Sequence, residues 1–123
     1  MSPEARKKLV FPKARRLMLT SQFAHVRTGG LSVRGQLLIL GFVRVEKDKP
    51  FQAGFVTSKR IGGAVVRNRV RRRLRDIVRT EQGRLQEGFW FVVVARPPAA
   101  RASYAALKDE WLRLAERASI LAP

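Results

Sequence analysis

Residues 67–79 have the sequence RNRVRRRLRDIVR, in which seven arginines and a single acid, Asp76, alternate with regularly spaced apolar residues. Counted from Ala64 at about 100° per residue, the apolar side chains fall between about 200° and 320° of a helical wheel. They form one stripe that contains Val66, Val70, Leu74, Ile77 and Val78. A stripe of this width predicts a helix, lasting to about Thr80, that packs against a sheet.

Most arginines of this helix lie outside the apolar stripe. One exposed flank, between about 300° and 80° of the wheel, contains Arg67, Asn68, Arg71, Arg72, Arg75 and Arg79. Arg69 and Arg73 fall on the far side. Because a guanidinium can bind phosphate oxygens in pairs and stack on bases, the exposed flank suits a polyanion. The glycines at 62–63, with Lys59 and Arg60 beside them, would leave free helix amides where a phosphate could also bind.

The net charge of +17 is concentrated in two segments of the chain. Residues 1–34 carry +7 and residues 57–79 carry +8, whereas residues 35–56 and 80–123 carry only +1 each. Cations packed this densely repel one another, so the fold is stabilised when a polyanion binds and releases its condensed counterions. A merely solvated surface would carry interspersed acids, as residues 80–123 do. The charge distribution therefore favours nucleic acid as the partner.

Length and composition narrow the possibilities further. With 46% apolar residues, the 123-residue chain suits one compact domain, and we expect a single domain over residues 1–123 with a flexible extension at 1–11. There is no cysteine and only one histidine, His25, so neither a disulfide nor a histidine-rich metal site is available. The longest apolar runs are far shorter than the roughly 20 residues that span a bilayer. The N-terminal segment lacks the apolar centre of a secretory signal, so we expect a cytoplasmic protein with no membrane contact.

The rest of the pattern predicts two more helices. The first begins near Thr20 or Ser21, either of which could cap it, and ends at the glycines 29–30. The second is capped by Ser103 and has an apolar side at spacings of three and four. At this spacing Trp111 is expected in the core rather than on an RNA-stacking surface.

Three segments have the pattern of buried strands, namely 35–46, 51–58 and 89–96. The first two are separated by the charged, proline-containing stretch EKDKP at 46–50, which is typical of a turn. This spacing predicts that they form an antiparallel hairpin.

The run TSKRIGGAVVRNRVRRRLRD at 57–76 resembles the signature of the bacterial ribonuclease P protein subunit, with its Arg-Asn-Arg core at Arg67, Asn68 and Arg69. The similarity covers roughly residues 12–118, and includes RRLMLTSQFAHVRTGG and FWFVVVARPPAARASY. It implies an α/β (α+β) two-layer sandwich, whose mostly antiparallel four-stranded sheet is packed with three helices. The arginine helix would be a left-handed crossover between parallel strands, where periodicity alone predicts the ordinary right-handed connection.

In this family the protein subunit is not the catalyst. It binds a large catalytic RNA, which uses Mg²⁺ to cut the 5′ leader from precursor tRNA. The resemblance thus implies a non-catalytic subunit of an endoribonuclease, monomeric when free, with ribonuclease P RNA and precursor tRNA as partners. Mg²⁺ would be held by the RNA and the substrate. The nine acids of the chain agree with this, because they form no HxE, paired-aspartate or other hydrolytic motif.

The family's functional residues can be carried over one position at a time. The implied RNA-binding residues are Lys59, Arg60, Arg67, Asn68, Arg69, Arg71, Arg72 and Arg75. A cleft between the first helix and the sheet would receive the leader, with Phe23 matching an aromatic of that cleft. Arg27 stands where a second aromatic is common, and the strand GQLLILGF lacks a tyrosine found in some members. Leader contacts are therefore expected to be more electrostatic in this chain.

Two other classes of function share parts of the pattern. A ribosomal or other structural RNA-binding protein would have the same charge, size and α/β strand pattern. A sequence-specific DNA-binding protein fits less well, because its recognition helix usually projects from a bundle towards base edges. The helix at 64–80 is instead expected to be half buried against a sheet and to present arginines suited to phosphates.

Overall fold

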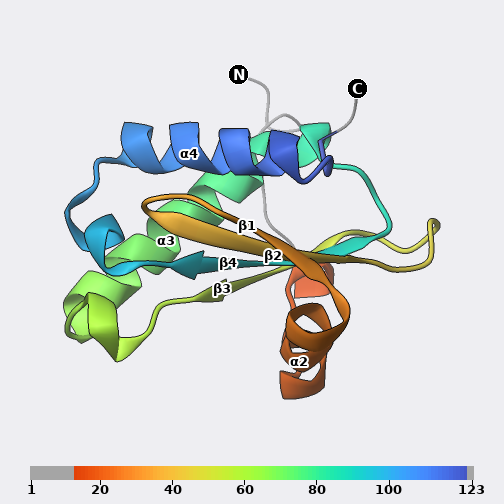
Figure 1. Cartoon of the computed structure of the whole chain (residues 1–123), viewed down its shortest axis with the longest axis horizontal. Coiled ribbons are helices and arrows are strands. Elements are labelled where there is room, and N and C mark those ends of the chain that lie inside the picture. Colours follow the sequence, from red (N-terminus) through yellow and green to blue (C-terminus); the bar gives the residue numbers. More distant parts are fainter. Residues whose placement is uncertain (1–12, 122–123) are drawn as a thin grey trace.

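The computed structural model describes residues 13–121, so the predicted flexible extension at 1–11 lies outside the described residues. Within this range four strands form one mixed sheet in the order β1-β2-β4-β3 (Figure 1). The strands are β1 (Leu31–Arg34), β2 (Leu38–Arg44), β3 (Gln52–Val56) and β4 (Phe89–Ala95). The α-helices are α2 (Thr20–Gly29), α3 (Ala64–Glu81) and α4 (Tyr104–Arg117). Short 3-10 helices are η1 (Lys13–Arg15), η2 (Lys59–Ile61), η3 (Gln82–Arg84) and η4 (Pro97–Arg101).

The sheet combines antiparallel and parallel pairs around β4. Strand β2 runs antiparallel to both β1 and β4, whereas β3 runs parallel to β4 with Gln52 opposite Trp90. Helix α3 lies between β3 and β4 in the chain and is therefore the crossover between two parallel strands. The predicted α+β fold class is confirmed, while the left-handed sense of this crossover stays a prediction.

The predicted hairpin between residues 35–46 and 51–58 is wrong. Strands β2 and β3 lie on opposite sides of β4, and β2 forms its hairpin with the short β1 instead. The reason is the FWFVVVA run of β4, which is apolar on both faces and is buried best in the middle of the sheet. The connecting loop crosses the start of β4, where the N–H of Val45 donates to the Gly88 carbonyl at 2.8 Å and the N–H of Gly88 donates to Lys49 at 2.9 Å. Gly88 has φ 81°, which favours glycine.

The ends of the helices follow local hydrogen bonding. Helix α3 covers the range predicted from the wheel, and Ser103 caps α4 by accepting a hydrogen bond from the Ala106 N–H at 3.1 Å. The predicted cap of α2 at Thr20 or Ser21 is wrong, because the capping position is Leu19. The side-chain oxygen of Gln22 accepts from the Leu19 N–H at 3.0 Å, so a glutamine within the helix satisfies the donor that precedes it.

The core has two parts, one on each face of the sheet. Helices α3 and α4 cover one face, where Val70, Leu74, Ile77 and Val78 of α3 are buried with no exposed surface. Trp111 is buried there as predicted, with its ring 6.4 Å from that of Phe91. Helix α2 lies on the other face, below the sheet in Figure 1, with Val26 packed near Leu17 and Val92. No helix of residues 13–121 is long and apolar enough to cross a membrane.

A buried acid of α4 holds the turn between β1 and β2. The Glu110 carboxylate accepts hydrogen bonds from the backbone N–H groups of Gln36, Leu37 and Leu38 at 3.1, 2.7 and 2.6 Å. On the other side of the turn, the Arg96 guanidinium donates to the Gly35 carbonyl at 2.6 Å. These bonds satisfy the charge of a buried acid and fix the hairpin that forms one wall of the groove beneath α2.

Candidate nucleic-acid interface

The eight predicted RNA-binding residues lie on one continuous stretch formed by η2 and α3. Exposed side chains are Lys59, Arg60, Asn68, Arg72 and Arg75, and partly buried ones are Arg67, Arg69 and Arg71. Gly63 is the capping position of α3 and no side chain caps the helix there, so its first amides are open to a ligand. Four of the five residues of the apolar stripe are buried and Val66 is half-buried, while most cations of the helix face outward, as the wheel predicted.

Arg71 is held in place by its neighbours. Its guanidinium donates to the hydroxyl of the buried Thr57 at 2.6 Å and to the side-chain oxygen of Asn68 at 3.5 Å. One turn further along, Arg75 has a pKa below its ordinary value, because of partial burial and then the nearby charges of Arg16 and Arg71. Three guanidinium groups from two separate segments are therefore gathered in one place, where an anion would relieve their repulsion.

Arg69 and Arg73 lie on the other flank of α3 and contact the protein itself. The Arg69 guanidinium donates to the carbonyl of Ala100 at 3.0 Å, and that of Arg73 donates to the carbonyl of Ala102 at 3.1 Å. Both bonds tie α3 to the segment that leads into α4. This agrees with their position on the wheel, and an RNA contact by Arg69 stays a prediction.

A hollow of about 340 Å³, which we call the basic pocket, lies where α3, β3 and the segment before α2 meet. Its lining residues are Lys13, Arg16, Leu17, Met18, Phe23, Ala53, Gly54, Phe55, Arg71 and Arg75. Four of these side chains are cationic, two are aromatic, and none of the described residues that line the pocket is an acid. Cations beside aromatic rings are the combination that binds the phosphates and bases of single-stranded nucleic acid.

Arg16 was missed by the analysis of the sequence. It reaches the pocket because the Leu17 N–H donates to the Ala53 carbonyl at 2.9 Å and a parallel bridge joins Arg16 to Ala53. The chain therefore extends the sheet briefly beyond β3. The signal was a basic pair, Arg15 and Arg16, followed by an apolar residue, and it does not reveal which part of the fold the pair approaches.

A second hollow, the α2 groove, has a volume of about 360 Å³ and lies between α2 and the sheet. It is mostly apolar and is lined by Phe23, Val26, Arg27, Gly30, Leu31, Ser32, Ile39, Gly41, Val56, Val92 and Val94. The two residues predicted for a leader cleft, Phe23 and Arg27, thus line one groove. Phe23 packs directly over Gly54, where an added Cβ would lie 2.4 Å from the ring.

Phe23 lines both the α2 groove and the basic pocket. One half-buried aromatic ring therefore separates an apolar hollow, suited to bases, from a cationic hollow, suited to phosphates. This shared wall places Phe23, predicted for the leader cleft, beside Arg71 and Arg75, predicted for RNA binding.

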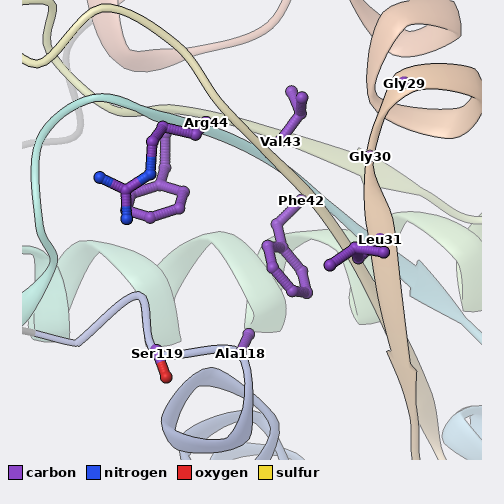
Figure 2. Close-up of a pocket in the computed structure, with 9 residues that line it drawn as sticks. Gly29, Gly30, Leu31, Phe42, Val43, Arg44, Ala118 and Ser119 are labelled. Carbon is purple, nitrogen blue, oxygen red and sulfur yellow. The ribbon is translucent and has the colours of Figure 1, made fainter.

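Two further hollows lie outside this pair. One, of about 420 Å³, gathers the cations Arg34, Arg60 and Arg96 near Pro97 and Pro98. The other, of about 430 Å³, lies between the end of α2, strand β2 and the end of α4, and Figure 2 shows Phe42 and Arg44 in it. The Arg44 guanidinium lies 4.9 Å from the centre of the Phe89 ring. The described residues lining this last hollow include none of the predicted site residues.

Several acids of the described residues form contacts within the fold. Asp76 accepts a hydrogen bond from the Tyr104 hydroxyl at 2.7 Å and pairs with Arg79, which together hold the pKa of Asp76 below its ordinary value. Glu81 pairs with Lys108 at 3.5 Å. Within residues 13–121, no three histidine or acidic side chains lie close enough together to hold a metal ion.

The comparison of sequences identifies the class of protein. A family model described as Ribonuclease P matches residues 11–119. The ribonuclease P protein component of Acidothermus cellulolyticus is 41% identical over 109 residues, which cover 88% of this chain and 91% of the relative. That of Symbiobacterium thermophilum is 35% identical over 109 residues, covering 89% and 95%. The chain belongs to the ribonuclease P protein component family, and the resemblance of residues 57–76 is confirmed.

Solved structures agree with this assignment. The RNase P protein of Staphylococcus aureus matches with a TM-score of 0.81 and 22% identity, covering 88% of this chain and 98% of that one, which shows the fold. The RNase P protein from Thermotoga maritima matches with a TM-score of 0.75 and 26% identity, covering 83% and 96%.

Proposed function

We propose that this chain is the protein subunit of ribonuclease P, binds the catalytic RNA and the 5′ leader of precursor tRNA, and promotes removal of the leader. The observation that carries the proposal is that Phe23 lines both the basic pocket and the α2 groove. Phosphates of the catalytic RNA would lie near Arg71 and Arg75, and a base of the leader would lie near Phe23. The membership of the chain in the ribonuclease P family indicates the reaction in which such a surface would take part.

The start of α3 and the α2 groove would bind different RNAs. The open amides at the start of α3, with Lys59 and Arg60 beside them and Arg72 on the helix, would bind phosphates of the folded catalytic RNA. The α2 groove would receive the leader, with Arg27 contributing a charge at a position where an aromatic ring would stack. Leader recognition in this chain is therefore more dependent on salt than recognition by two stacking rings would be.

The chemistry of cleavage would be carried by the RNA. Magnesium ions prefer several oxygen ligands, and no three acidic or histidine side chains of residues 13–121 lie close enough together to supply them. We propose that Mg²⁺ is held by the catalytic RNA and the substrate. The protein's own contribution would be to bind and orient the precursor, and to lower the Mg²⁺ concentration that cleavage requires by neutralising phosphates.

Reconstitution tests this function directly. A bacterial ribonuclease P RNA is mixed with precursor tRNA at a low Mg²⁺ concentration, with and without the folded protein, and the released leader is measured. We expect cleavage only when the protein is present, while the RNA alone should cleave at high Mg²⁺, which shows that it is competent. Tight RNA binding without any gain in cleavage would instead indicate a ribosomal or other structural RNA-binding protein.

A further inference from the structure

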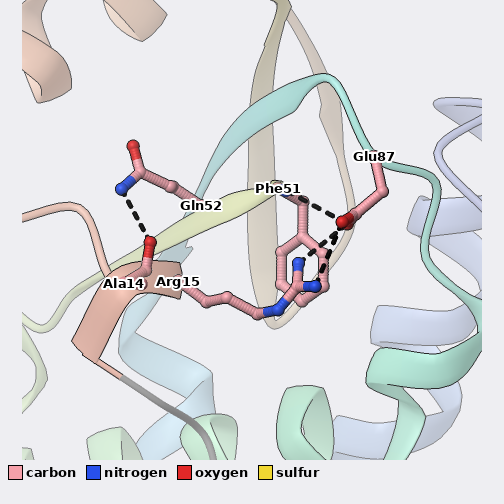
Figure 3. A network of polar contacts seen from close by, with 5 residues as sticks. All are labelled: Ala14, Arg15, Phe51, Gln52 and Glu87. Atoms are coloured by element: carbon pink, nitrogen blue, oxygen red, sulfur yellow. Dashed lines mark hydrogen bonds and ion pairs between the residues drawn. The ribbon is translucent and has the colours of Figure 1, made fainter. Parts of the chain in front are cut away.

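The segment Lys13–Leu17 is attached to the edge of the sheet beside β3. Besides the backbone bond between Leu17 and Ala53, the Gln52 side-chain amide donates to the carbonyl of Ala14 at 2.9 Å (Figure 3). These contacts bring Arg16 to the wall of the basic pocket. The position of the Arg16 side chain therefore depends on how firmly this short segment is held.

A further attachment of the segment is made by Arg15, the residue before Arg16. The Arg15 guanidinium forms two bonds to the Glu87 carboxylate, of 2.7 and 3.0 Å, and lies 4.3 Å from the centre of the Phe51 ring. The same carboxylate accepts a hydrogen bond from the Phe51 N–H at 3.2 Å (Figure 3). Glu87 thus joins the segment before α2 to the start of β3 through paired, charge-assisted bonds, which have a defined geometry.

Arg16, Arg71 and Arg75 all line the basic pocket, so their like charges are close together. Partial burial and then the charges of Arg16 and Arg71 lower the pKa of Arg75, which agrees with repulsion at this place. Before an anion binds, this repulsion favours movement of the segment around Arg16 away from α3. A tie between Arg15 and Glu87 opposes that movement, and Arg15 itself is not among the residues that line the pocket.

We propose that Arg16 contacts RNA phosphates together with Arg71 and Arg75, and that Glu87 is a positioning residue that holds Arg16 there through Arg15. This inference rests on the RNA-binding function proposed above. It assigns a supporting role in RNA binding to an acid, which is the opposite of what the net charge alone would predict.

Net charge alone and positioning of Arg16 by Glu87 make opposite predictions for the removal of Glu87. Replacing any acid raises the net charge of +17 by one, so a purely electrostatic field predicts tighter binding of RNA. If Glu87 positions Arg16, Glu87→Ala binds RNA more weakly despite its greater charge. Asp109→Ala is the matched control. Asp109 also pairs with an arginine, Arg113, at 3.8 Å, but it lies on the exposed side of α4.

The experiment measures the dissociation constant of the full chain for a bacterial ribonuclease P RNA over a series of salt concentrations. Glu87→Ala should raise the constant roughly threefold to tenfold, as expected when one arginine–phosphate contact is misplaced. Its salt dependence should be shallower by somewhat under about one unit, as for one lost phosphate. Thermal melts of both variants give the folded fraction, and affinities are compared per folded molecule. Equal or tighter binding by Glu87→Ala than by Asp109→Ala overturns the proposal.

A double-mutant cycle tests the route through Arg16. Arg16→Gln should itself weaken binding, and adding Glu87→Ala to it should cause no further loss, because the positioned side chain is already gone. Additive losses would show that Glu87 acts elsewhere, which also overturns the proposal. If instead the unmodified chain does not bind the RNA, the proposed function fails as a whole, so the two failures are distinguishable.

Discussion

Helices α3 and α4 pack on the same face of the sheet but present different surfaces to solvent. Both bury an apolar stripe in one core, with Leu74 on α3 and Leu107 on α4 fully buried. Outside the stripe, α3 carries seven arginines and two acids, whereas α4 carries three basic side chains and two acids, Asp109 and Glu116, besides the buried Glu110. Asp109 and Arg113 form a pair. The stripe determines where a helix packs, and the rest of its surface determines what it can bind.

The largest expected effect is on the shared core. Leu74→Ala should lower the free energy of unfolding by about 2 to 5 kcal/mol, because a fully buried side chain is lost and a cavity remains. Arg72→Ala, on the exposed flank of the same helix, should change it by less than about 0.5 kcal/mol. Urea unfolding of both variants measures the difference. Similar losses for the two would mean that the arginine flank is also structural.

The next effect concerns the charged surface of α3. Replacing Arg67, Arg71 and Arg75 with glutamine should reduce the salt dependence of RNA binding by about 2 to 3 units, while stability changes little. Loss of the bond from Arg71 to Thr57 is offset by relief of the repulsion at Arg75. RNA titrations over a range of salt measure the affinity of this variant and of a control that has lost the three cations of α4, at positions 108, 113 and 117. Equal losses of affinity would show that only net charge matters.

A smaller effect is expected at the wall shared by the two hollows. Phe23→Ala should weaken binding of precursor tRNA by about 1 to 3 kcal/mol, the contribution of one stacked base, and should affect mature tRNA less. Because Phe23 also packs over Gly54, Phe23→Leu serves as the control that keeps the packing and removes the aromatic face. The ratio of the two tRNA affinities is measured for each variant. A ratio that stays at the wild-type value in both would remove the stacking role.

The smallest effect comes from the one acid within the arginine run. Hydrogen bonds from Arg79 and then Tyr104 lower the pKa of Asp76 below its ordinary 3.8, so its carboxylate stabilises the fold at neutral pH. This contribution is fully present above the ordinary value and is lost as the pH falls through the lowered one. Urea unfolding of wild type and Asp76→Asn should therefore differ at pH 7 and converge in strong acid. A constant difference at every pH would contradict this.

Periodicity predicted the helices because a helix is a local structure. The stripe of α3 and the cap at Ser103 depend on residues within a few positions of one another, and both are confirmed. The cap of α2 was misplaced by one or two residues. The side chain of Gln22 reaches back and accepts a hydrogen bond from the Leu19 N–H, so the helix can begin after Leu19 without a serine or threonine at the capping position.

Strand pairing could not be predicted in the same way, because it depends on residues far apart in the chain. Nearness favoured a hairpin of β2 with β3, but β4 pairs with both. Strand β1 was missed because its four residues, LSVR, are too few for their alternation of apolar and polar side chains to stand out. The parallel pair around α3 came only from the family resemblance, which contains information about the fold that the periodicity of one sequence does not.

The candidate site was predicted as two separate sets of residues. The structure gathers members of both, Phe23 from the first helix and Arg71 from α3, around the basic pocket. The place of Arg16 in the pocket was not predicted, and neither was the ion pair between Arg15 and Glu87, because those two residues are 72 positions apart. Conversely, the wheel correctly set Arg69 apart from Arg71, since that distinction depends only on helical geometry.

The strand order also has a consequence for synthesis on the ribosome. Strands β2 and β3 each pair with β4 rather than with each other, so neither the sheet nor the surface that supports α3 is complete until residues 89–95 have emerged. By then the nascent chain already contains residues 1–79, which carry a net charge of +16. Among the described strands, β1 and β2 can pair earlier, and Arg16 can bridge to Ala53 of β3, but a lone hairpin is at best marginally stable in water. The most cationic part of the chain is therefore made before it can fold, beside ribosomal RNA.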